Sequence, residues 1–428
     1  MRESSFEERE IHMNILKRLG ALLAAGTLLL CAGCTNAGSG ESAAAPKTEV
    51  SIAIPENVLG EASTMLPTLD LDKYAIPEGD AMTFVKNLKI GWNLGNTFDA
   101  SNANISEANE LDYEKAWCGV ITTTDNIAAI KAAGFNTIRI PVSWHNHVDA
   151  DNKISEKWMA RVKEVVDWCR ACDLYVILNT HHDIDDKGYY PDTANLERSK
   201  AFLTSVWTQI AETFKDYDDH LILESLNEPR LMGTSVEWWL DKTKPECVDS
   251  ANVINQLNQL FVDTVRGVGG ENATRWLMCP GYAASADSAL YDGFVVPTDA
   301  AGHIIVSVHA YTPYNFALNA AGTKDFPLDS PSPKQEITNF MDNLYGKFVS
   351  KGIPVVIGEF GARNKDNLQD RVNFAAYYVA CARARGITCV WWDNNAFTGS
   401  GENFGLLARR DNTFLYPDLV QALMKYAE

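Results

Sequence analysis

From about residue 80 onward, short apolar runs alternate with longer segments in which apolar positions recur at helical spacing. Short runs bounded by polar or turn-forming residues are typical of buried β-strands, whereas apolar positions three or four residues apart indicate amphipathic helices. The clearest helical segments are 125–133, 158–172 and 340–351. The strand-like runs are Leu88–Asn93, Thr137–Pro141, Leu174–Asn179, Leu221–Leu226, Arg275–Cys279, Ile304–Val308, Ile353–Ile357 and Ile387–Trp392.

Eight such runs interleaved with helices over residues 80–428 predict the α/β class and a (β/α)8 TIM barrel that forms one domain. An open, doubly wound sheet is the alternative, but no glycine-rich nucleotide-binding fingerprint follows any of the runs. In a parallel barrel the carboxyl ends of all strands emerge on the same face. Polar residues that end the runs should therefore lie together, however far apart they are in the sequence.

The N-terminal segment has a different character. A basic stretch that contains Lys17 and Arg18 precedes the apolar run 19–30, which is the layout of a secretory signal peptide and is too short for an ordinary membrane span. The run ends in Leu30-Cys-Ala-Gly-Cys34, which resembles a bacterial lipobox, although Cys31 stands where Leu is usual. We therefore expect residues 1–34 to be a signal peptide and Cys34 to carry a lipid, so that the protein is extracellular or on the cell surface. Cleavage by an ordinary signal peptidase, which would release the chain, is the alternative.

Residues 35–79 are rich in Ala, Ser, Gly, Glu and Pro and show no sustained periodicity. That composition predicts a flexible linker ahead of the domain at 80–428. Apart from the N-terminal lipid anchor, the sequence predicts no attachment to a membrane.

The overall composition excludes several classes of partner. The formal net charge of −19 argues against nucleic acid, because phosphate backbones are bound by clustered Lys and Arg. Eleven Trp and fifteen Tyr are more than a core of this size needs, and flat rings suit the apolar faces of sugars. The nine Cys show no zinc spacing, since the pair Cys169 and Cys172 has no second pair to complete four ligands. We expect no metal and no cofactor.

Two carboxylates end apolar runs in the same way. Glu228 closes LILESLNE before Pro229, which has no N–H and disfavours helix at the preceding residue. Glu359 occupies the corresponding place in IPVVIGEFG. A pair of carboxylates on one rim is what cleavage of a glycosidic bond requires, one to protonate the leaving oxygen and one to act at the sugar carbon.

A set of motifs occurs in order along the chain: Gly91-Trp-Asn-Leu-Gly-Asn-Thr97, Asn136-Thr-Ile-Arg-Ile-Pro141, Asn179-Thr-His-His182, Leu226-Asn-Glu-Pro229, His309-Ala-Tyr311, Ile357-Gly-Glu-Phe-Gly361 and Trp391-Trp-Asp-Asn394. This ordered set resembles glycoside hydrolase family 5, the cellulase family A, and is most similar to its bacterial endo-β-1,4-glucanase and xyloglucanase branch. The resemblance covers essentially all of residues 80–428. It implies a (β/α)8 barrel and a hydrolase that retains anomeric configuration, acts on a β-glucan polysaccharide as a monomer and needs no cofactor.

By this resemblance, Glu228 is the catalytic acid/base and Glu359 the nucleophile. A nucleophile must be ionised, and we expect the guanidinium of Arg139 to favour the charged form of Glu359. Glu228 must instead hold a proton before it acts as a base toward water, so we expect a raised pKa set by its negative neighbour. Asn227 should contact the 2-hydroxyl of the sugar being cleaved.

Four further residues receive binding roles from the resemblance. His309 and Tyr311 should orient the carboxylates, and His181 should bind sugar hydroxyls. Trp392 should be the platform under the sugar at the point of cleavage. Strand alternation alone selects Trp392 over Trp391, so a shift of one residue would exchange them.

The specific substrate stays open, because the loops after the strands set it. Cellulose, xyloglucan, mixed-linkage glucan (the substrate of a lichenase) and mannan are alternatives, and Trp117, Trp144, Trp238 and Trp239 are candidate glucan platforms. A metal-dependent hydrolase of barrel fold is a rival that would use His145, His147, His309 and Asp393. A surface lipoprotein that captures glycans without catalysis is the second rival.

Overall fold

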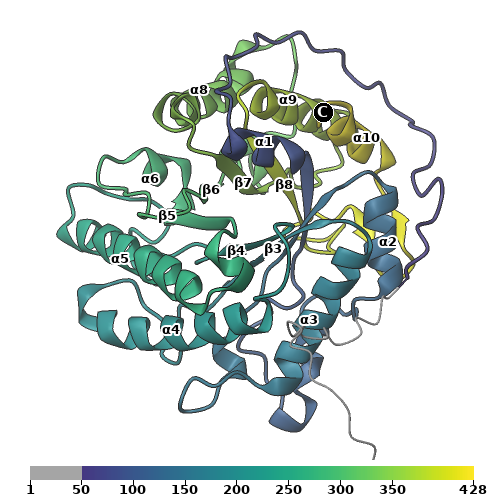
Figure 1. Ribbon diagram of the computed structural model, residues 1–428. Helices are drawn as coiled ribbons and strands as arrows, with labels where there is room; N and C mark the ends of the chain where they lie inside the picture. Colours follow the sequence, from purple (N-terminus) through teal and green to yellow (C-terminus); the bar gives the residue numbers. More distant parts are fainter. Residues whose placement is uncertain (1–50) are drawn as a thin grey trace, which may run out of the picture. The chain divides into compact units, whose positions relative to one another are not determined.

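The computed structural model describes residues 51–428, and its centre is a closed barrel of parallel strands in the order β1 to β8 (Figure 1). The last strand closes the barrel by pairing with the first, from Ile90 opposite Cys389 to Leu94 opposite Asp393. The predicted (β/α)8 fold is thereby confirmed, and the doubly wound sheet is excluded. The predicted signal peptide and Cys34 lie outside the described residues.

Every predicted strand is present, with small differences in its limits. The strands are β1 Ile90–Leu94, β2 Thr137–Ile140, β3 Tyr175–Asn179, β4 Leu221–Glu224, β5 Leu277–Ser285, β6 Ile304–His309, β7 Val355–Phe360 and β8 Thr388–Asp393. The largest shift is in β5, which ends at Ser285 rather than at Cys279. The strand β7 begins only after Pro354, because proline has no N–H for the ladder. Glu359 lies within β7, whereas Glu228 lies beyond the end of β4.

Helices surround the barrel and connect its strands (Figure 1). They are α1 Asp80–Asn87, α2 Thr124–Ala132, α3 Glu156–Ala171, α4 Leu196–Thr213, α5 Pro245–Val268, α6 Ala286–Leu290, α7 Tyr314–Ala317, α8 Pro331–Lys347, α9 Leu368–Ala384 and α10 Pro417–Lys425. Short 3-10 turns lie at η1 Glu107–Lys115, η2 His145–His147, η3 Thr193–Asn195, η4 Gly270–Ala273 and η5 Val349–Lys351, and a small hairpin follows β8 at β9 Leu407–Ala408 and β10 Thr413–Phe414. Among residues 51–428, no helix is both long enough and apolar enough to cross a membrane.

The amino end of the barrel interior is filled by apolar side chains. Alternate residues of a strand point to the same face, so one residue from each strand contributes to each interior layer. The helix α1 covers this end with Phe84, Val85 and Leu88. The strand residues packed against them are Ile177, Ile222, Met278, Ile305, Val356 and Val390.

The described part of the expected linker, residues 51–79, is an extended segment that packs on the outside of the barrel (purple in Figure 1). The backbone N–H groups of Ser63 and Thr64 donate to the Asp418 carboxylate at the start of α10, at 2.5 and 2.6 Å. The Tyr74 hydroxyl donates to Asp342 on α8 at 2.6 Å, and the guanidinium of Arg385 lies 4.4 Å from the Tyr74 ring centre. Residues 51–79 thus differ from a flexible linker, because apolar and hydrogen-bonding contacts fix them; we call them the strap.

Candidate active site

Arg139 on β2 is the centre of a hydrogen-bond network at the carboxyl end of the barrel. Its Nε donates to Glu224 at 2.7 Å, and one terminal nitrogen donates to Glu359 at 2.8 Å and to Asn93 at 3.0 Å. The other donates to the Asn227 carboxamide oxygen at 2.8 Å. Burial alone would lower the pKa of Arg139, but the two carboxylates outweigh it and raise that pKa. The guanidinium is therefore charged and fixes the position of each acceptor.

Glu224 is a functional residue that the sequence analysis missed. It is fully buried at the end of β4 and accepts hydrogen bonds from Arg139, from Ser307 at 2.5 Å and from Asn179 at 3.1 Å. The available signal was a carboxylate inside an otherwise apolar run, LILES. Because Glu224 accepts the hydrogen bond from Nε of Arg139, it orients the guanidinium so that a terminal nitrogen reaches Glu359.

Glu359 is held by two donors, Arg139 on one carboxylate oxygen and the Tyr311 hydroxyl, at 2.9 Å, on the other. Only 6% of the Glu359 side chain is exposed. Burial raises the pKa of Glu359, and the nearby Glu228 adds to this effect, while His309, Arg139 and Tyr311 oppose it. The expectation that Arg139 neighbours Glu359 is met in position, but the pKa of Glu359 is raised rather than lowered.

Glu228 lies on the loop after β4 and accepts a hydrogen bond from Nδ1 of His309 at 2.9 Å. Burial would raise the pKa of Glu228, but the hydrogen bond and charge of His309, with the charge of Arg230, lower it to about 2. The expectation of a raised pKa for Glu228 is therefore wrong for the free protein. The sequence could not show that the imidazole of His309 would face Glu228.

His309 connects the two carboxylates. Its Nδ1 lies 2.9 Å from Glu228 and 3.6 Å from Glu359. Burial would lower the pKa of His309, yet the two carboxylates raise it, against the opposing charge of Arg139. A proton on His309 therefore sits next to Glu228 and is stabilised by both carboxylates.

The two carboxylates are close to each other. One oxygen of Glu228, one oxygen of Glu359 and one ring nitrogen of His309 all lie within 4.8 Å of one another. Carboxyl groups about 5–5.5 Å apart are typical of retaining glycosidases, whereas inverting enzymes separate them by about 6.5–9.5 Å to admit a water molecule. The arrangement therefore fits direct attack by one carboxylate on a sugar carbon.

The remaining sequence-predicted residues also lie at this end of the barrel. The ring of His181, directly beyond β3, is parallel to that of Trp392, with centres 5.9 Å apart. Trp391 points the other way, packs edge-on against Phe360 and donates to the Phe404 carbonyl at 3.0 Å. The structure thus selects Trp392 over Trp391 as the ring at the site.

The four residues of the metal-hydrolase alternative do not come together. His145 bonds to Asp183 at 3.0 Å, and His147 bonds to Glu110 at 2.8 Å. Asp393 accepts from Trp92 at 2.9 Å, and His309 faces Glu228. Within residues 51–428, these residues form no common ligand cluster, so this alternative is wrong.

The candidate platforms divide into buried and exposed rings. Trp144 is fully buried and packs in the core. Trp117 is 43% exposed, with its ring centre 5.6 Å from that of His182. Trp238 and Trp239 are 53% and 60% exposed. Three of the four rings are therefore accessible to a ligand. Trp238 also lies near the site, since the guanidinium of Arg230 is 4.0 Å from its ring centre and 3.7 Å from Glu228.

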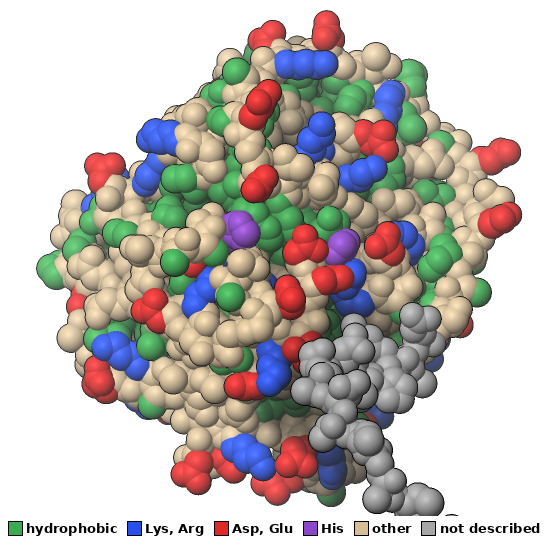
Figure 2. All heavy atoms as spheres, in the orientation of Figure 1, with side chains coloured by type: hydrophobic (Ala, Val, Ile, Leu, Met, Phe, Trp, Pro, Cys, Tyr) green, Lys and Arg blue, Asp and Glu red, His purple; other side chains and the backbone are tan. Residues whose placement is uncertain are grey.

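Charged side chains of both signs lie on one face of the molecule. Acidic and basic side chains are interspersed on the face drawn in Figure 2, and no continuous basic patch is visible there.

Comparisons with known proteins agree with this geometry. A family model described as Cellulase (glycosyl hydrolase family 5) matches residues 98–398. Endoglucanase A of Clostridium longisporum is 45% identical over 83% of this chain and 67% of its own length. Endoglucanase 1 of Ruminococcus albus is 40% identical over 96% of this chain and 98% of its own length.

Solved structures show the same similarity. A glycoside hydrolase 5 lichenase from Caldicellulosiruptor sp. F32, in complex with cellotetraose, is 55% identical with a TM-score of 0.84 and covers 86% of this chain and 100% of its own. A broad specificity endoglucanase from Ruminococcus champanellensis with bound cellotriose is 43% identical with a TM-score of 0.75, over 82% of this chain and 100% of its own. The chain belongs to the cellulase family, glycosyl hydrolase family 5.

Proposed function

We propose that this glycoside hydrolase is an endo-β-1,4-glucanase that cleaves internal bonds of cellulose or related β-glucans by double displacement, with retention of configuration. The observation that carries the proposal is the approach of Glu228 and Glu359 to within 4.8 Å at the carboxyl end of the barrel. That spacing suits a covalent glycosyl–enzyme intermediate. The endoglucanase names of the curated relatives support the substrate class.

In the first step, a carboxylate oxygen of Glu359 attacks the anomeric carbon, and the bond to the leaving glycosidic oxygen breaks. Glu228 gives its proton to that oxygen. In the second step, Glu228 takes a proton from water, the water oxygen bonds to the anomeric carbon, and Glu359 leaves. Arg139 and Tyr311 hold the two oxygens of Glu359 throughout, which keeps the nucleophile aligned.

The proton for the first step is stored on His309 in the free enzyme. Its Nδ1 lies 2.9 Å from Glu228, and the guanidinium of Arg139 lies 3.4 Å from its other ring nitrogen. The positive charge of Arg139 opposes that of protonated His309. Transfer of one proton from Nδ1 to Glu228 produces the acid form of Glu228. It relieves this repulsion but gives up the attraction between His309 and the two carboxylates.

Binding of the sugar is assigned to three residues around the carboxylates. The carboxamide oxygen of Asn227 is occupied by Arg139, which directs its NH2 group away from the guanidinium and makes it available to the 2-hydroxyl. His181 and Trp392 present parallel rings beside the carboxylates. A sugar stacks its apolar face on such a ring while its hydroxyls meet the imidazole nitrogen.

Among the alternative substrates, mixed-linkage glucan is supported by the similarity to a lichenase. Xyloglucan and mannan are supported only by membership of the family. The test is incubation of the purified protein with carboxymethylcellulose, barley β-glucan, xyloglucan and glucomannan. We expect a rapid loss of viscosity with short β-1,4-linked products, and NMR of the first product should show the β-anomer. Release of the α-anomer would contradict the double-displacement mechanism.

The non-catalytic glycan-capture alternative makes the opposite prediction. It requires glucan binding without release of reducing sugars. The fixed contacts to Glu359 argue against it, because a binding surface has no need of a buried, oriented carboxylate. A reducing-sugar assay beside a pull-down on insoluble cellulose separates the two functions.

We also propose that Cys34 anchors the protein to the outer surface of a bacterial cell and that the enzyme acts as a monomer. The basic and apolar stretches ahead of Leu30-Cys-Ala-Gly-Cys34 support the anchor. Cys34→Ser should move activity from the membrane fraction to the culture medium. Unchanged partition of this variant would favour ordinary signal-peptide cleavage.

A further inference from the structure

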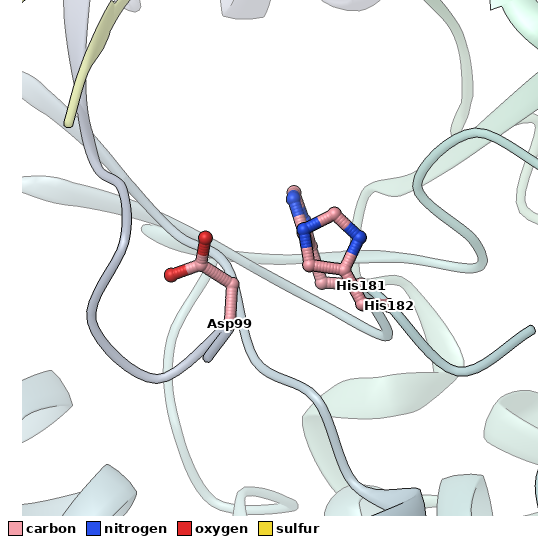
Figure 3. Close-up of side chains that lie close together, drawn as sticks. All are labelled: Asp99, His181 and His182. Carbon is pink, nitrogen blue, oxygen red and sulfur yellow. The ribbon is translucent and has the colours of Figure 1, made fainter. Parts of the chain in front are cut away.

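A second group of potential ligands lies next to the carboxylate pair. It consists of Asp99, on the turn after β1, with His181 and His182, directly beyond β3 (Figure 3). One carboxylate oxygen and one nitrogen from each ring lie within 4.8 Å of one another. Figure 3 shows the carboxylate and both imidazoles side by side.

Asp99 has no cation bonded to it. It is fully buried, and the hydrogen bonds to its carboxylate come from the backbone N–H groups of Asn96 at 3.0 Å and Thr97 at 2.6 Å. Among residues 51–428 no Lys or Arg lies within ion-pair distance of its carboxylate, and the charge of Arg409 acts on it only from farther away. Burial raises the pKa of Asp99, and the backbone N–H groups and the charge of Arg409 oppose this effect. A buried carboxylate without a paired cation favours binding of one.

Most of the imidazole nitrogens of His181 and His182 have no hydrogen-bond partner in the described part of the chain. Burial, together with the charges of neighbouring residues, lowers the pKa of both rings. Nδ1 of His181 contacts the Asn179 carboxamide at 3.1 Å. Its other nitrogen, and both nitrogens of His182, have no hydrogen-bond partner among the described residues. His181 itself is only 3% exposed.

We propose that Asp99, His181 and His182 bind one divalent transition-metal ion of the Zn2+ type. Two imidazoles and a carboxylate are a ligand set that Zn2+ accepts, with water in the fourth position. Bonds of about 2.0–2.1 Å in a tetrahedral site place donors about 3.4 Å apart. His182 is the partly exposed member of the three.

Occupation of this site inhibits the enzyme, and this part of the inference rests on the proposed function. His181 lies parallel to Trp392 and is assigned to the sugar at the point of cleavage. A metal ion on His181 removes the ring nitrogen that the sugar needs. Zinc and glucan therefore compete for the same side chain, without any role for zinc in catalysis.

The test is titration of the purified full chain with ZnCl2 by isothermal calorimetry. We expect one site in the micromolar range that is weakened at least about tenfold in His182→Asn, because a ligand is lost. His182→Cys should retain zinc, since a thiolate also binds it. The matched control is His220→Asn, which changes the exposed Asp218, Asp219 and His220 cluster and should leave the site unchanged.

Three results would overturn parts of the inference. No saturable binding of ZnCl2 by the folded wild type, or equal affinity in His182→Asn with an unchanged melting temperature, rejects the metal site. If the Glu359→Gln variant binds zinc with the same affinity in the presence and absence of cellotetraose, the proposed competition is rejected. Zinc binding by a protein that releases no sugar from any glucan keeps the metal site and rejects the proposed function instead.

Discussion

The same strands present apolar side chains at one end of the barrel and charged or amide side chains at the other. On β3, Ile177 faces the amino end and Asn179 the carboxyl end, two residues later. On β4 the corresponding pair is Ile222 and Glu224. The residues share a direction because strand side chains repeat every second position. One apolar layer and one polar layer therefore follow from a single alternation.

The two layers are stabilised by different physical effects. The amino-end layer gains from removal of apolar surface from water, and its members can be exchanged for others of similar volume. The carboxyl-end layer must satisfy each buried polar atom, and Arg139 alone bonds to Glu224, Glu359, Asn93 and Asn227. A polar layer tolerates loss of a partner poorly, because the group left behind stays buried and unpaired. The comparison predicts separable effects of mutation at the two ends.

The largest effect is expected from Glu359→Gln, which removes the nucleophile but keeps its shape. We expect kcat on a soluble β-glucan to fall by at least about 10^4-fold, with the fold retained. Glu228→Gln should cost about 10^2–10^4-fold as the loss of a general acid. Reducing-sugar assays and circular dichroism measure both. Full activity of either variant on an unactivated polymer would contradict its assignment.

Arg139→Met tests whether the polar layer depends on its central cation. Removal of one member of a buried ion pair costs about 3–5 kcal/mol of the free energy of unfolding, because Glu224 and Glu359 lose their partner. Activity should also fall, since Glu359 loses a donor. Denaturant unfolding and kcat measure the two effects. Loss of only one of them would show that position and stability are not coupled through Arg139.

Ile222→Ala makes the contrasting change in the apolar layer. The side chain is fully buried, so we expect a loss of about 2–5 kcal/mol of unfolding free energy from the cavity it leaves. The kcat of the remaining folded protein should be unchanged, because no polar contact is lost. Ile222→Val is the graded control and should cost about 0.5–1.5 kcal/mol. A change in kcat without a change in stability would contradict the separation of the two layers.

His309→Gln tests the storage of the proton. In the wild type, the basic limb of the kcat/KM profile follows His309, whose pKa is raised above its ordinary 6.5. Without the imidazolium, Glu228 must hold the proton itself, and its pKa rises from about 2 toward that of an ordinary buried carboxyl. The basic limb should therefore move to lower pH by at least about one unit. A basic limb at its wild-type position would assign the proton to another group.

The smallest effect is expected outside the barrel, at the strap. Asp418 accepts bonds from Ser63 and Thr64. Burial would raise the pKa of Asp418, but the backbone and side-chain hydrogen bonds from these residues lower it. Because its folded pKa is lowered, its contribution to stability is present above its ordinary pKa of 3.8 and is lost as pH falls through the folded value. Asp418→Asn should cost about 1 kcal/mol at pH 7 and reduce this acid sensitivity, as urea unfolding at pH 7 and pH 3 would show.

The strands and helices could be predicted from the sequence because burial imposes a hydrophobic period on each element. The runs that became β1 to β8 and the helix over 158–172 needed no tertiary information, and neither did the approach of Glu228 and Glu359 once a barrel was predicted. The packing of the strap could not be predicted from the sequence, since its composition resembles that of a flexible linker. Its contacts come from residues more than 250 positions away.

The sequence by itself determined the barrel, the family and the pair of carboxylates, because these depend on periodicity and on motifs that lie at strand ends. Only the tertiary structure decided the directions in which the pKa values of Glu228, His309 and Glu359 are shifted. His309 and Arg139 reach Glu228 and Glu359 from other strands, and the pKa of a buried group depends on the distance to such charges. For the same reason, Glu224 and the group of Asp99, His181 and His182 were not found from the sequence. The side chains of each group come together only where separate strands end side by side.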